Sequence, residues 1–114
     1  MEKETQRQQK VSRSIMRDIG EIFLSEGKEL TQGAMVSVTK VRIVPDLSYA
    51  KVYISVFPFE KGDEILTRMR SNDWQIRFWL GKRVKQQLRI VPELAFHLDD
   101  SLEYVANIDS LLKK

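Results

Sequence analysis

MVSVTKVRIVPDLSYAKVYISVF, residues 35–57, is the stretch that decides the fold. Two runs rich in Val, Ile and Tyr, residues 35–44 and 48–57, are separated by a Pro-Asp-Leu segment that favours a turn. Because β-branched and aromatic side chains pack well on a pleated surface, both runs are predicted to be strands. Their short connection predicts an antiparallel hairpin.

The two faces of the hairpin differ in hydrophobicity. Side chains alternate between faces along a strand, and the second run places four apolar side chains on one face: Ala50, Val52, Ile54 and Val56. In the first run the apolar residues shift from even-numbered positions, up to Val38, to odd-numbered positions, from Val41 onward. A β-bulge near residues 39–40 would restore a continuous apolar face, so we predict a bulge there.

Helices are predicted on both sides of the hairpin. Upstream, residues 5–24 repeat apolar side chains every three or four positions: Val11, Ile15, Ile19, Ile22 and Phe23. Downstream, a short helix is expected after Gly62, followed by a break at residues 71–73 and a second helix over residues 74–88 that Asp73 caps. The buried ridge of that second helix is predicted to be Ile76, Leu80, Val84 and Leu88.

A third strand and a helical tail complete the predicted order. After Pro92, apolar residues alternate at Leu94, Phe96 and Leu98, which predicts a strand. Apolar positions after Ser101 predict a short helix: Leu102, Val105, Ile108 and Leu112. The fold class is therefore α+β, a two-layer domain with a three-stranded sheet and helices on one face. We divide the chain into a flexible segment (1–10), the domain (11–100) and the helical tail (101–114).

Composition sets the class of protein. With 114 residues, of which 42% are hydrophobic and 31% charged, the chain fits one compact domain. There is no cysteine, which excludes a disulfide framework and is compatible with a reducing compartment, so a cytoplasmic protein is expected. Residues 1–10 are charged and Gln-rich, and no apolar run approaches the roughly 18 residues of a membrane span. Neither secretion nor membrane insertion is expected.

Catalytic chemistry has few candidate residues. There is one histidine, no phosphate-binding loop and no nucleophile-elbow motif. His97, even with Asp99 and Asp100 nearby, supplies too few ligands for a metal site, and we interpret it as a strand histidine. The two aspartates are interpreted as a strand-end turn and a helix cap. The sequence therefore predicts no enzyme activity, no cofactor and no small-molecule substrate.

Basic residues are concentrated in the two downstream helices. Residues 66–90 contain seven Lys and Arg against one Asp, although the net charge of the chain is only +3. Trp74 and Phe78 project toward the lysines of the second helix, and RNA-binding proteins combine cations for phosphates with rings for base stacking. The alternative is that both rings pack beneath a neighbouring loop. The residues predicted to bind RNA are Arg70, Asn72, Trp74, Arg77, Phe78, Lys82, Arg83, Lys85 and Arg89.

The hairpin carries a second and less specific cluster. Three cations lie beside two tyrosines: Lys40, Arg42, Lys51, Tyr49 and Tyr53. Strand aromatics beside cations stack bases in some RNA-binding sheets. The same tyrosines also fit ordinary cross-strand pairs.

The chain resembles the ribosome-binding factor A family over most of its length. The likeness rests on VRIVPDLSYAKVYISV at 41–56, on Ile-Arg at 76–77 with Leu-Gly-Lys-Arg at 80–83, on LRIVPELAF at 88–96 and on IDSLL at 108–112. Within these segments the Val-Pro-Glu-Leu-x-Phe run is the most specific.

This resemblance implies a KH-like domain of helix-strand-strand-helix-helix-strand order that binds the small (30S) ribosomal subunit and assists late 16S rRNA maturation. Family members have an Ala-x-Gly kink between the two central helices in place of the Gly-x-x-Gly loop of KH domains. This chain has Asn72-Asp73-Trp74 at that place. The bulky Trp74 would block close approach of RNA to the backbone, but it offers a stacking surface.

The sequence thus predicts a monomeric ribosome assembly factor whose partner is the small ribosomal subunit and its 16S rRNA. Two other hypotheses stay open. One is a generic KH-like module that binds single-stranded RNA. The other is a protein-interaction adaptor that uses its C-terminal helix, since residues 91–114 contain five acidic side chains against two lysines.

Overall fold

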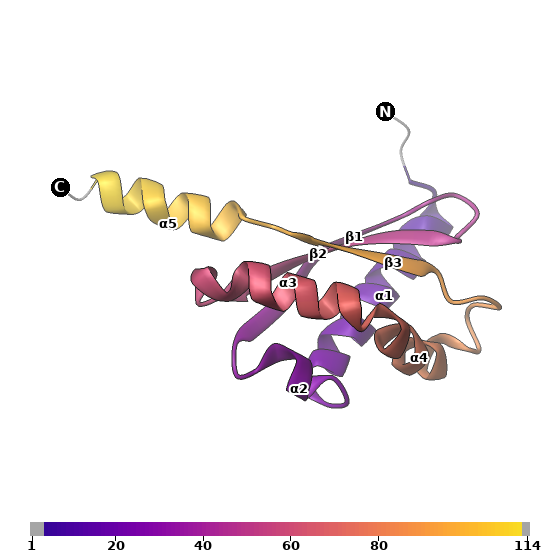
Figure 1. Ribbon diagram of the computed structural model, residues 1–114. Helices are drawn as coiled ribbons and strands as arrows, with labels where there is room; N and C mark the ends of the chain where they lie inside the picture. The colour runs from indigo at the N-terminus through magenta and orange to yellow at the C-terminus, as the bar shows by residue number, and fades with distance from the viewer. Residues whose placement is uncertain (1–3, 113–114) are drawn as a thin grey trace.

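The computed structural model describes residues 4–112, and the side chains of residues 4–108. Its elements are α1 (Gln6–Leu24), α2 (Lys28–Thr31), β1 (Met35–Ile43), β2 (Tyr49–Phe57), the 3-10 helix η1 (Phe59–Lys61), α3 (Gly62–Ser71), α4 (Asp73–Val84), β3 (Glu93–Leu98) and α5 (Ser101–Leu112). The sheet has the order β1-β2-β3, and α1, α3 and α4 lie on the same side of it (Figure 1). The predicted α+β two-layer fold is confirmed.

The hairpin forms as predicted, and the third strand joins its far side. β1 pairs antiparallel with β2, and the register shifts between Val38 and Lys40, which confirms the predicted bulge. β3 pairs with β2 in parallel, with Phe96 opposite Val52. The four even-numbered apolar residues of β2 are at most 4% exposed. They face the helices and form the centre of the core together with Phe96 of β3.

Helix α1 begins with a capping box that fixes its first turn. The Thr5 hydroxyl accepts the backbone N–H of Gln8 at 3.1 Å, and the Gln8 side chain accepts the backbone N–H of Thr5 at 2.9 Å. The buried Gln8 also donates its amide to the carbonyl of Ile43 at 3.0 Å, which ties the helix to the end of β1. Residues 6–10, assigned above to a flexible segment, are thus the first turns of α1.

Helix α4 is shorter than predicted. It ends at Val84, and residues 85–87 form a turn, so the prediction of a helix through residue 88 is wrong. Leu88 is still buried, as predicted for the ridge, and its N–H donates to the carbonyl of Val84 at 2.8 Å. After this turn the chain leads into β3, and Arg77 of α4 binds carbonyls of that segment, as described below.

The two outlying helices differ from each other. The sequence patterns gave no indication of α2, a single turn that follows Gly27. α5 is the predicted C-terminal helix, and it extends away from the body of the domain (Figure 1). Three of its large apolar side chains are more than half exposed: Leu102, Tyr104 and Val105. No helix of the described residues has both the length and the apolar content needed to cross a membrane.

Candidate nucleic-acid interface

The break between α3 and α4 is formed by Asn72. Its N–H donates to the carbonyls of Arg68 and Met69 at 3.1 and 3.2 Å, and its side-chain amide donates to Arg68 at 2.8 Å. The carbonyl of Asn72 then accepts the N–H groups of Gln75 and Ile76, each at 3.1 Å, and so begins α4. The predicted Asp73 cap is wrong, because Asp73 is the first helical residue and no side chain caps α4. The half-buried Asn72 ends α3.

The exposed face of α4 carries two aromatic rings and two lysines. Trp74 is 64% exposed and Phe78 is 56% exposed, so the alternative that both rings pack beneath a loop is wrong. Lys82 follows at the same four-residue spacing, and its Nζ lies 4.6 Å from the centroid of the Phe78 ring. The exposed Lys85 comes directly after the helix. We call Trp74, Phe78, Lys82 and Lys85 the α4 stripe.

The α4 stripe faces outward because the opposite side of the helix is buried in the core. Ile76, Leu80 and Val84 are at most 1% exposed. At about 100° per residue, the four stripe residues span less than a quarter of the helix circumference on the other side. Neither lysine of the stripe has an ion-pair partner among the described residues.

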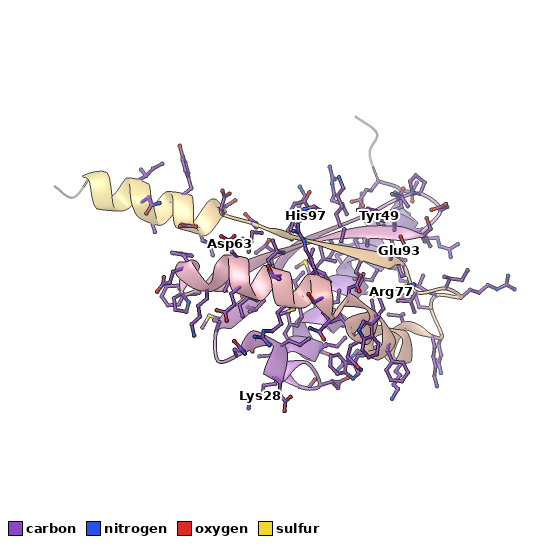
Figure 2. The ribbon with its side chains drawn as sticks, in the orientation of Figure 1. Lys28, Tyr49, Asp63, Arg77, Glu93 and His97 are labelled. Carbon is purple, nitrogen blue, oxygen red and sulfur yellow. The ribbon has the colours of Figure 1, made fainter. Side chains whose placement is uncertain are left out.

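Two of the arginines predicted to bind RNA instead hold the fold together. Arg70 donates through Nε and Nη2 to the carbonyl of Phe96 at 3.1 and 2.9 Å, which joins α3 to β3. Arg77 donates through Nε to Pro92 at 3.0 Å and through Nη2 to Val91 at 2.9 Å. Figure 2 labels Arg77 where α4 meets the segment leading into β3. Both guanidinium groups satisfy backbone acceptors, so their place in an RNA site remains only a prediction.

Arg83 is also engaged within the molecule. Its guanidinium bridges two carboxylates of the α1 region, Glu21 at 2.7 Å and Glu26 at 3.0 Å, and its side chain is 26% exposed. The pKa of Glu26 is lowered from 4.5 to about 2, first by the Ser25 hydroxyl, then by its own backbone N–H and by Arg83. The positive charge of Arg83 is therefore largely balanced before any ligand arrives. A local charge count could not show this, because the partners lie far away in the sequence.

Arg89 lies apart from the α4 stripe, in the loop between α4 and β3. It is exposed and lines a surface cavity with Arg7 and with residues 46–48 of the hairpin turn. Of the nine predicted site residues, the structure therefore brings four together as the α4 stripe. It assigns three arginines to internal contacts, uses Asn72 to end α3 and places Arg89 four residues beyond Lys85 in the connection to β3.

The end of β3 contains a helix cap. Asp99 accepts the Ser101 N–H at 3.0 Å and the Thr39 hydroxyl at 2.7 Å, and these hydrogen bonds lower the pKa of its carboxyl group. The interpretation of the aspartate pair as a strand-end turn and helix cap fits these bonds, with the Asp99 side chain accepting the first N–H of α5 and the Asp100 carbonyl accepting the N–H of Tyr104. His97 is half-buried on the strand, with its ring centroid 5.5 Å from that of Tyr53. No group of three or more His, Cys, Asp or Glu that could hold a metal ion occurs in the described part of the chain.

The helix-strand-strand-helix-helix-strand order and the mixed three-stranded sheet define a KH-like domain. The family model for ribosome-binding factor A matches residues 7–112. The chain belongs to the ribosome-binding factor A family.

Two relatives agree with this assignment, and solved structures share the fold. A ribosome-binding factor A from Flavobacterium psychrophilum is 46% identical over 110 residues, covering 96% of this chain and 85% of the relative. One from Cytophaga hutchinsonii is 40% identical, covering 97% of this chain and 84% of the relative. The crystal structure of ribosome-binding factor A from Thermus thermophilus has the same fold, with a TM-score of 0.66 at 22% identity over 80% of this chain and 94% of that one.

A further neighbour is a Thermus thermophilus homology model of ribosome binding factor A, fitted into the cryo-EM map of its complex with 30S. It matches with a TM-score of 0.56 at 20% identity, covering 86% of this chain and 97% of that one.

Proposed function

We propose that this chain binds the small ribosomal subunit and assists late maturation of its 16S rRNA. The α4 stripe carries the proposal, because α4 and its C-cap Lys85 present two exposed rings and two lysines that have no acidic partner in the described part of the chain. Rings stack on unpaired bases, and lysines neutralise phosphates. The names of the relatives and the 30S complex of one structural neighbour support a ribosomal partner.

The proposed mechanism is selective binding. A rigid domain that binds one rRNA conformation better than another shifts the population toward that conformation. In this mechanism no covalent bond is made or broken, so the proposed factor is not an enzyme and needs no cofactor. We propose further that it acts in the cytoplasm as a monomer. Arg70, Arg77 and Arg83 contribute by holding α3 and α4 in place, and Arg89 extends the positive surface beyond α4.

The test is co-sedimentation of the full-length protein with purified small subunits. Lys82→Glu combined with Lys85→Glu is expected to weaken association at least about tenfold at low salt, because two cations that face phosphates become anions. The salt dependence should also flatten by about one unit for each lysine that contacts a phosphate. The melting temperature should stay unchanged, since both side chains are exposed.

A matched control applies the same charge change elsewhere. Arg13 and Lys28 are exposed on α1 and α2, and the pair Arg13→Glu with Lys28→Glu should leave subunit association within about twofold of wild type. Equal losses in the two double variants would mean that only net charge matters. Unchanged sedimentation of the Lys82 and Lys85 variant would refute the proposed role of the α4 stripe.

A further inference from the structure

Within residues 4–112, the second face of the sheet carries no helix. α1, α3 and α4 all lie on the side to which the buried residues of β2 point (Figure 1). Tyr53 of β2 is half-buried and Lys51 is exposed on the opposite face. Figure 2 labels Tyr49, Glu93 and His97 along this part of the sheet. The proposed function does not use this surface.

Cross-strand register brings aromatic and basic side chains together on this open face. One row across the three strands is Lys40, Tyr53 and His97. The next row is Arg42, Lys51 and Ala95. Rows on one face are spaced by two residues, roughly 6.6 Å along a strand. We call Lys40, Arg42, Lys51, Tyr53 and His97 the open-face cluster.

The two rings of the open-face cluster make one aromatic platform. The centroids of Tyr53 and His97 are 5.5 Å apart, and their planes differ by 31°. The platform exists because β3 pairs in parallel with β2, which places residue 97 directly opposite residue 53. The sequence cluster of the hairpin included Tyr53 but not His97, because the register of β3 could not be known.

Cations surround this platform. The Nζ of Lys40 lies 5.8 Å from the centroid of the Tyr53 ring, and Lys51 is exposed in the adjacent row. Arg42 is 44% exposed and has a single long ion-pair contact, 3.9 Å to Glu4. Three acids lie near the edges of the two rows: Glu4 beside Arg42, Glu93 opposite Tyr49 at one end, and Asp99 at the other end, where it accepts the Thr39 hydroxyl and interacts electrostatically with Lys40.

We propose that the open-face cluster is a second RNA-binding surface, which stacks a base of single-stranded RNA on Tyr53 and His97. The phosphates on either side of that base would contact Lys40 in one row and Arg42 and Lys51 in the next. Aromatic platforms beside cations bind single strands in this way, with little dependence on sequence. Because positive charge is concentrated around the rings, a polyanion fits this face better than an apolar partner. The proposal does not depend on the α4 stripe.

The test is an NMR titration of the full-length protein with single-stranded hexa-adenylate RNA. Amide shifts are expected at residues 40, 51, 53 and 97, together with upfield shifts of the Tyr53 and His97 ring protons from the stacked base. Inorganic tripolyphosphate should move the amides of residues 40 and 51 but not the ring protons. Shifts confined to α4, or ring protons that respond equally to tripolyphosphate, would overturn the proposal.

Matched variants separate stacking from packing. Tyr53→Leu should weaken hexa-adenylate binding about fivefold or more, whereas Tyr53→Phe keeps the ring and should bind within about twofold of wild type. Equal binding by both variants would refute stacking. Lys51→Glu changes an exposed side chain and provides a second test if Tyr53→Leu does not fold, since undiminished binding by Lys51→Glu would also refute the proposal.

RNA binding by the open-face cluster can be tested independently of the proposed role of the α4 stripe. The Lys82→Glu, Lys85→Glu variant should keep all shifts on the open face, even where it no longer sediments with small subunits. If its open-face shifts disappear as well, the two surfaces are not independent and the inference of a second site is wrong.

Discussion

The two flanks of α4 use positive charge in different ways. Along the α4 stripe, Lys82 and Lys85 have no acidic partner among the described residues. On the packed side of the helix, Arg77 at one edge of the buried ridge binds the carbonyls of Val91 and Pro92, and Arg83 at the other edge binds two carboxylates. Lys82 and Arg83 are adjacent in the chain, yet one faces solvent and the other is paired. A count of basic residues therefore overstates the positive charge that is free to contact a ligand. The internal contacts show which side chains are already engaged.

The largest effect is expected for Arg77→Ala. This change removes both hydrogen bonds to Val91 and Pro92 and leaves their carbonyls without the charged donor. Hydrogen bonds to charged groups contribute about 1.5–3 kcal/mol, and because Arg77 is only half-buried we expect the free energy of unfolding to fall by about 2–3 kcal/mol for the pair. Urea denaturation at neutral pH measures it.

Arg77→Lys is the control for charge alone. It keeps the positive charge but not the planar two-donor geometry, so it should recover less than half of the lost stability. If Arg77→Ala is as stable as wild type and instead fails to bind small subunits, the division of α4 into a structural and a binding flank is wrong.

A smaller effect, on binding rather than stability, is expected for Trp74→Ala. Trp74 is 64% exposed, so its removal should change the free energy of unfolding by less than about 0.5 kcal/mol. Loss of one stacked base should cost about 1–2 kcal/mol of affinity for small subunits, roughly five- to thirtyfold. Fluorescence or sedimentation titration measures that loss.

Trp79 provides an internal contrast for this prediction. It is partly buried and packs against the core, so Trp79→Ala should lower the melting temperature, whereas Trp74→Ala should not. Similar melting temperatures for the two variants, or full affinity of Trp74→Ala, would contradict the assignment of Trp74 to the binding flank.

The smallest effect concerns the pH dependence of the Glu26 carboxylate, whose pKa is lowered first by the Ser25 hydroxyl, then by its own backbone N–H and by Arg83. The folded-state pKa of Glu26 is about 2, below its ordinary value of 4.5. A carboxyl group with a lowered pKa stabilises the fold above its unfolded pKa and loses that contribution as the pH falls. The stability from Glu26 should therefore decline between pH 4.5 and pH 2. Urea unfolding across this range should show that the free energy of unfolding declines less steeply with falling pH in Glu26→Gln than in wild type. Parallel curves would contradict the lowered pKa of Glu26.

Periodic patterns predicted the elements well because they reflect local burial. The buried positions Ile76, Leu80 and Val84 repeat every four residues, and the parity change in the first strand located the bulge. These features depend on neighbours a few residues away. The fold class and the core face of each long element could therefore be predicted from the sequence.

Features that depend on distant contacts could not be predicted in this way. The hydrogen bonds from Arg77 to the carbonyls of Val91 and Pro92 join residues 14 and 15 positions apart. The pairing of Arg83 with Glu21 and Glu26 joins segments about sixty residues apart. The sequence could therefore predict that two rings and two lysines share one exposed face, but it could not predict the internal contacts of the three arginines.

The parallel pairing of β3 with the central strand has a consequence for synthesis of the chain. Residue 49 of β2 pairs with residue 93, so a nascent polypeptide exposes one unpaired backbone edge of β2 until the last strand has been translated. Pairs so distant in sequence form slowly, and an exposed edge is an opening for aggregation. Phe96 of β3 is part of the core that the hairpin and α1 share, so the domain can complete that core only after residues 93–98 have been translated.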